Sequence, residues 1–225
     1  MERRNERTIC QLQTSSNLKL FFMQRLVAKI ISIIFHPLFM PVYGVLLLFF
    51  ISGTFLSYLP GIVKRIVFII IAVNTIILPL SVVPFYISQK IIKSVHMDTS
   101  RERIIPLTLN GFFFYLGYYL LNRLQIPDLI KVYMLASFSV VVVSLLVSLK
   151  WKISIHMIGI GGLTGAIISI SWHLGVDMKA VWMGLILCSG LIGFARLELN
   201  KHTPAQVYSG FVIGLVVAGG VMLVG

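Results

Sequence analysis

Apolar residues fill most of the chain in long runs, and short polar breaks separate these runs. A helix needs about 20 mostly apolar residues to cross the hydrocarbon core of a bilayer. Pro79 and Pro84 are expected to kink the second crossing, which helices within a membrane tolerate. The pattern predicts an all-α, polytopic membrane helix bundle with about six or seven transmembrane helices, near residues 37–58, 62–87, 107–122, 129–149, 153–174, 179–195 and 204–224.

The segment before the first crossing has a different pattern. Between residues 18 and 35, three cations are set among Leu, Phe, Val and Ile residues: Lys19, Arg25 and Lys29. This mixture is typical of an amphipathic helix that lies in the membrane interface. We therefore expect two parts, a polar tail with an interfacial helix over residues 1–35 and a transmembrane helical domain over residues 36–225.

Composition narrows the class of protein further. Hydrophobic residues make up 58% of the chain and charged residues 12%, whereas an ordinary soluble domain carries about a quarter charged residues. The net charge of +12 would suggest nucleic acid as a partner in a soluble chain. Here the basic residues gather at predicted membrane edges, where they contact anionic headgroups. The expected partners are membrane lipids and not nucleic acid, and nothing in the composition indicates an oligomeric state.

Counting the crossings places the polar loops relative to one another. With seven crossings, loops 88–106, 150–152 and 196–203 emerge on one face, together with the N-terminus. That face carries 14 of the 19 Lys and Arg residues. The positive-inside rule therefore predicts that it is cytoplasmic.

The candidate chemistry also lies on this face. Arg196, His202 and Gln206 follow one another in the last loop, and Ser154 and His156 precede the fifth crossing. Arginine binds phosphate oxygens through forked, charge-assisted hydrogen bonds. One histidine can attack phosphorus while another protonates the departing alkoxide. The set therefore suits a phosphate ester, although a pair of interfacial side chains reaching toward headgroups and a helix N-cap with an interfacial histidine are alternative interpretations.

A family resemblance adds to this interpretation. Arg196, His202 and Gln206, followed by Gly210 and Gly214, resemble the Ser-Arg-x5-His-x3-Asp signature of the type-2 phosphatidic acid phosphatase and haloperoxidase superfamily. The segment 154–156 resembles its Pro-Ser-Gly-His signature. Loop 88–106, with its spacing of His96, Arg103 and Pro106, resembles a loosened Lys-x6-Arg-Pro signature. The three segments occur in the family's order between about residues 90 and 220.

The resemblance implies a hydrolase of lipid phosphates or diphosphates that uses no metal and no cofactor. The substrate would be of the phosphatidate, phosphatidylglycerophosphate or polyprenyl-phosphate type. The protein would lie in a bacterial inner membrane with this site outside the cytoplasm, which opposes the charge count. His202 would be the nucleophile that forms a phosphohistidine, His156 the general acid, and Gln206 the residue that orients the nucleophile. The implied substrate-binding residues are Arg196, Arg103, Ser154, Arg101, Lys93 and His96.

Several departures from the family pattern keep other functions open. Gln206 replaces the carboxylate, so it can orient His202 but cannot stabilise an imidazolium as an anion does. Ala195 replaces a serine, and Ile153 and Ile155 replace proline and glycine. A non-catalytic or weakly active relative that binds or moves an anionic lipid, or scaffolds a membrane complex, is the main alternative. A prenyl transferase would need a second acidic cluster, and a channel or ion-coupled transporter would need paired acids within its spans.

Overall fold

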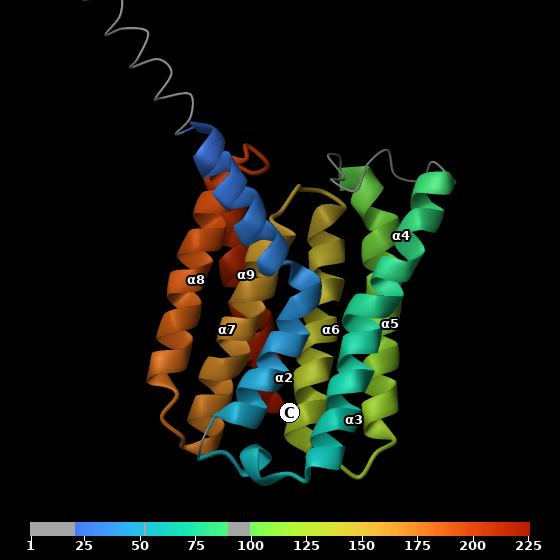
Figure 1. Ribbon diagram of the computed structural model, residues 1–225, viewed down its shortest axis with the longest axis vertical. Helices are drawn as coiled ribbons and strands as arrows, with labels where there is room; N and C mark the ends of the chain where they lie inside the picture. Colours follow the sequence, from blue (N-terminus) through green and yellow to red (C-terminus); the bar gives the residue numbers. More distant parts are fainter. Residues whose placement is uncertain (1–20, 52, 90–99) are drawn as a thin grey trace, which may run out of the picture.

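The computed structural model describes residues 21–51, 53–89 and 100–225, with no side-chain description for residues 100–103, and these residues form helices joined by short connections (Figure 1). A helix over residues 21–34 comes first. Three short elements interrupt or connect the longer helices: the 3₁₀-helices η1 (Pro37–Phe39) and η2 (Phe55–Tyr58), and the π-helix η3 (Val73–Ile77). The α-helices that follow the first are α2 (Met40–Phe50), α3 (Gly61–Ala72), α4 (Leu78–Ser88), α5 (Ser100–Asn122), α6 (Asp128–Ser148), α7 (Ile155–Leu174), α8 (Lys179–Glu198) and α9 (Pro204–Val224).

Seven helical segments within the described residues are long and apolar enough to cross a membrane, with mean hydropathies from 1.4 to 2.7. Exposed apolar side chains cover the outside of the bundle, as expected where lipid rather than water surrounds it. The all-α class is confirmed, and the chain is an integral membrane protein. The segments are Phe21–Phe50, Gly61–Ser88, Ile104–Asn122, Asp128–Ser148, Ile155–Leu174, Lys179–Glu198 and Pro204–Val224.

The first of these segments differs from the predicted crossing at 37–58. It combines the helix over residues 21–34 with η1 and α2, and α2 ends at Phe50. A break separates its two halves because Pro37 follows His36, and a residue before proline is held away from the helical region. With 11 residues, α2 rises about 16 Å, roughly half of the hydrocarbon core. The interfacial position of the first helix stays a prediction.

The second crossing bends between α3 and α4 (Figure 1). The bend coincides with η3, just before Pro79, which lacks the N–H needed to continue a regular helix. A π-helical turn is a common way to absorb such a disturbance. The expected kink of this crossing is therefore present. The π-helix that accommodates it was not predicted from the sequence.

Helix α7 forms the centre of the bundle. It is 67% buried, compared with 28–39% for the other crossings. Glycines allow it to pack closely against α9, since a Cβ atom at Gly161 or Gly165 would collide with the backbone at Phe211 or Leu215. These small residues therefore serve close packing of the two helices.

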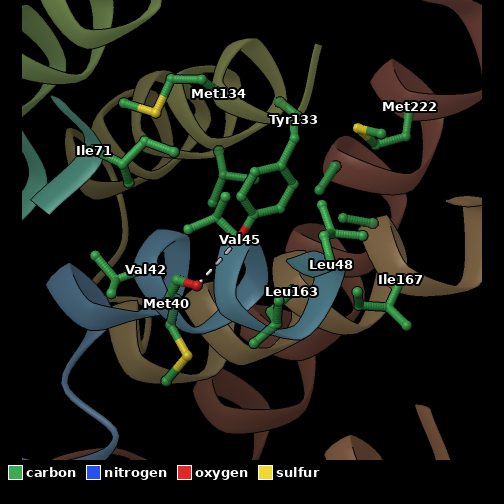
Figure 2. Close-up of a cluster of buried hydrophobic side chains, with 14 of the residues drawn as sticks. Met40, Val42, Val45, Leu48, Ile71, Tyr133, Met134, Leu163, Ile167 and Met222 are labelled. Atoms are coloured by element: carbon green, nitrogen blue, oxygen red, sulfur yellow. Dashed lines mark hydrogen bonds between the residues drawn. The ribbon is translucent and has the colours of Figure 1, made fainter. Parts of the chain in front are cut away.

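A second contact fixes α2 against α6. The Tyr133 hydroxyl donates a hydrogen bond of 3.2 Å to the Met40 carbonyl, amid buried side chains from α6, α7 and α9 (Figure 2). Its ring lies where a Cβ atom on Gly44 would have to be. Glycine at 44 therefore lets α2 approach α6 and bury this hydroxyl.

The helix ends near the candidate site lie together at one end of the bundle. The helix over residues 21–34 lies there, as do the α4 and α5 ends and the α6–α7 and α8–α9 connections (Figure 1). The C-terminus and the α2–α3, α5–α6 and α7–α8 connections lie at the opposite end. This arrangement is the one that the count of seven crossings predicts.

Candidate functional site

A cavity of about 200 Å³ opens among the helices at this end of the bundle. Three histidines and one arginine, which come from four different parts of the chain, are among the residues that line it: His36, His156, Arg196 and His202. The helices that carry them begin or end close by, at η1, α7, α8 and α9. His156 lies close enough to the other three residues to interact with them electrostatically. Two of the three sequence motifs therefore converge on one space.

The hydrogen bonds around Gln206 determine the protonation of His202. The Thr203 backbone N–H donates to Gln206 Oε1 at 3.2 Å, and His202 Nδ1 lies 3.1 Å from the same oxygen. An amide oxygen only accepts, so Nδ1 must carry the proton. In the neutral ring Nε2 then holds the lone pair, which is the tautomer that a nucleophile needs. His202 itself is buried, with 9% of its surface exposed.

Local sequence explains why this loop is well defined. Thr203 caps α9 by accepting from the Gln206 N–H at 3.5 Å, while the Gln206 side chain accepts from the Thr203 N–H. This is a capping box, and Pro204 at the first helical position favours the same helix start. The cap holds the Gln206 amide beside His202. One side chain therefore both starts the helix and orients the histidine.

The start of α7 is attached directly to the start of α9. The Ser154 N–H donates to the Gln206 carbonyl at 3.4 Å, and Gly210 leaves room for the Ser154 carbonyl. Ser154 is fully buried, and its hydroxyl has no hydrogen-bond partner among the described residues. The structure brings Ser154 next to the site, although Ser154 and Gln206 do not themselves line the cavity.

Ser32 is a site residue that the sequence analysis did not identify. His156 Nε2 lies 3.1 Å from the Ser32 carbonyl, and Arg196 Nη1 donates to the Ser32 hydroxyl at 3.4 Å. Since a carbonyl only accepts, His156 carries its proton on Nε2. The first helix therefore covers the site and contacts both an arginine and a histidine there. These contacts join residues that are 124 and 164 positions apart. Local sequence patterns therefore could not predict them.

His36 is a third histidine in the cavity wall. Its ring packs edge-on against His156, with ring centroids 5.3 Å apart. Its Nδ1 accepts a hydrogen bond of 3.4 Å from the Leu38 N–H and so caps η1. His36 therefore both begins a helix and lines the site.

The first motif is only partly described. Lys93 and His96 lie outside the described residues, and Arg101 and Arg103 occupy the first turn of α5 without a side-chain description. Pro106 and Asn110, farther along α5, line the cavity. The helix that follows this motif therefore reaches the site.

The charge of the cavity suits an anion. Its lining holds one arginine and three histidines, and no carboxylate belongs to the described part of that lining. Within the part of the chain that the structure describes, no group of three His, Cys, Asp or Glu side chains could hold a metal ion. A guanidinium beside an oriented imidazole can bind a phosphate and present a nitrogen nucleophile to it.

No family model, characterised protein or solved structure matches this chain.

Proposed function

We propose that the protein is a membrane lipid-phosphate phosphatase that works through a phosphohistidine intermediate. The observation that carries the proposal is the convergence of Arg196, His156 and the oriented His202 on one cavity. The resemblance of the sequence motifs to the type-2 phosphatidic acid phosphatase superfamily supports the same function. The resemblance further suggests a bacterial inner membrane as the location.

The proposed reaction has two balanced steps. His202 Nε2 attacks phosphorus, the P–O bond to the lipid breaks, and the departing alkoxide takes a proton from His156, which must enter this step as the doubly protonated imidazolium. Water then attacks the phosphohistidine, gives a proton to His156, and the P–N bond breaks to release inorganic phosphate. Arg196 neutralises the phosphate oxygens in both steps.

Substrate binding requires a rearrangement at Ser32. The Ser32 carbonyl and hydroxyl occupy the donors of His156 and Arg196 that a phosphate would use. A phosphate that enters the cavity replaces these contacts with stronger, charge-assisted ones. The first helix then shifts while the substrate is bound.

A second candidate is a non-catalytic protein that binds or moves an anionic lipid. Two observations favour it: an uncharged amide orients His202, and Ser32 already occupies both His156 and Arg196. Such a protein would retain the cationic cavity without turnover.

Phosphate release by the purified protein separates the two. We expect release from phosphatidate, phosphatidylglycerophosphate or a polyprenyl phosphate or diphosphate, and at least about a 10³-fold loss of kcat in His202→Ala, because the nucleophile is gone. Rapid acid-free quenching with a radiolabelled substrate should trap protein-bound phosphate in the wild type only. His173→Ala is the matched control, since His173 is an exposed histidine at the other end of α7. Release that persists in His202→Ala would exclude this nucleophile, and lipid binding without release would favour the second candidate.

A further inference from the structure

The cavity continues far below the residues that would bind phosphate. Its lining runs along α7 from Ile155 to Ala166 and along α6 from Ser144 to Tyr133. At 1.5 Å per residue each stretch rises about 16 Å. The cavity therefore reaches roughly half of the way through a hydrocarbon core about 30 Å thick.

The deep walls present almost no free polar group. The side-chain hydroxyls among them already donate to backbone carbonyls: Ser137 to Tyr133 at 3.0 Å, Ser144 to Val140 at 2.7 Å, and Tyr133 to Met40 at 3.2 Å. Apart from the Asn110 amide on α5, the remaining deep lining is apolar, and it includes Leu38, Phe114, Ala136, Val140, Val141, Ile158, Leu163, Ala166 and Ala218. Water or a sugar would find few partners there, whereas a hydrocarbon chain needs none.

Small residues keep the deep end open. Ala166 and Ala218 are buried and line the cavity, and a Cβ atom at Gly162 would lie 3.2 Å from Val140 and 3.7 Å from Ala218. α6, α7 and α9 thus meet closely at this level, so larger side chains would close the space. Tyr133 and Leu163, labelled in Figure 2, also line the cavity.

The volume favours one chain. A dry cavity of about 150 Å³ accommodates benzene, so a cavity of about 200 Å³ has room for one short hydrocarbon chain and not for two chains side by side. We propose that this cavity binds a single hydrocarbon chain of the lipid phosphate, and that Ala166 and Ala218 set the chain length the protein prefers. This inference rests on the proposed function, because the cavity is continuous with the proposed phosphate site.

Photolabelling locates the chain without requiring turnover. The probe is decyl phosphate with a diazirine at the end of its chain, bound to the His202→Ala protein in detergent micelles. We expect mass spectrometry to find the label on cavity residues between 133 and 141 or between 162 and 166. A label confined to outward-facing positions such as Val212 and Val216, which are 56% and 60% exposed, would overturn the proposal. Cavity labelling in a protein that releases no phosphate would leave this inference standing while the hydrolase proposal fails.

Kinetics with a series of n-alkyl phosphates tests the role of Ala218. In the wild type, kcat/KM should rise about fourfold for each methylene that enters the cavity and then level off. Ala218→Leu fills about three carbons of space, so it should lower kcat/KM for long chains by up to roughly 60-fold and leave short chains unchanged. Val216→Leu, on the exposed face of the same helix, is the control. Identical chain-length profiles for the two variants would overturn the role of Ala218.

Discussion

At the scale of single residues, one amide decides the chemistry of His202. Gln206 Oε1 receives both the Thr203 N–H and the His202 Nδ1–H. The amide fixes the tautomer but brings no negative charge to oppose the positive ring that would form in the proposed phosphorylation of Nε2. His202 is therefore oriented as a nucleophile requires, but Gln206 would not stabilise a positive charge on its ring.

Substitutions at Gln206 test this division of roles. Gln206→Ala should lower kcat about fivefold, because one hydrogen bond to the nucleophile is worth about 1 kcal/mol. Gln206→Glu keeps the length of the side chain and adds the charge that the amide lacks, so it should raise kcat above the wild type. Single-turnover kinetics of phosphoenzyme formation would measure both. Equal rates in the alanine variant and the wild type would contradict an orienting role for Gln206.

Residue-level contacts are open to prediction where the signal is local. The family resemblance implied that Gln206 orients His202, and the two residues lie four positions apart; the capping box between Thr203 and Gln206 is equally local, although it was not predicted. Ser32 contacts residues 124 and 164 positions away, and serine in an apolar helix carries no signal of its own. Contacts of that kind depend on tertiary packing and could not be predicted from a single sequence.

At the scale of elements, the close approach of α7 and α9 positions both proposed catalytic histidines. His156 begins α7 and His202 immediately precedes α9, so the angle and distance between these helices set the geometry of the site. A Cβ atom at Gly165 would collide with the Leu215 backbone, and one at Gly214 with the Ile158 backbone. Backbone contacts of this kind cannot relax by a change of rotamer.

Gly165→Ala is therefore expected to destabilise the protein by about 1–3 kcal/mol, the usual range for overpacking. Gly190→Ala is the matched control, because a Cβ atom there meets no atom within 4 Å. The control should be neutral or stabilising by up to about 1 kcal/mol, since alanine favours the helix. Thermal unfolding in detergent measures both variants. A Gly165→Ala protein as stable as Gly190→Ala would contradict this account of the α7–α9 contact.

Hydropathy predicts elements well when they are long and uniformly apolar. The last five crossings occur near the predicted residues because apolar length alone defines them. The first crossing was harder, since its cations indicated an interfacial helix while the structure assigns residues 21–50 to one candidate span. Hydropathy says nothing of hydrogen-bond register, so it could not reveal the π-helix at 73–77.

At the scale of the whole molecule, the basic end and the C-terminus lie at opposite ends of the helix bundle (Figure 1). If all seven candidate segments cross the membrane, these two ends lie on opposite sides of it. The parity of the crossings, rather than any single motif, explains why segments far apart in sequence converge on one site. Two arguments disagree about which side of the membrane the basic end faces. The charge count favours the cytoplasm, and the family resemblance favours the outer side.

Single cysteines resolve the sidedness and test the parity together. In a chain with Cys10→Ser and Cys188→Ser, we would introduce Trp151→Cys at the α6–α7 connection or Tyr58→Cys at the α2–α3 connection, both at exposed positions. A membrane-impermeant maleimide should label only one of them in intact cells, because the two lie at opposite ends of the bundle. The distribution of Lys and Arg predicts that Tyr58→Cys is the labelled variant. Labelling of Trp151→Cys alone would instead put the site outside the cytoplasm, where the cations would serve to bind substrate. Equal labelling of both variants before permeabilisation would contradict seven crossings.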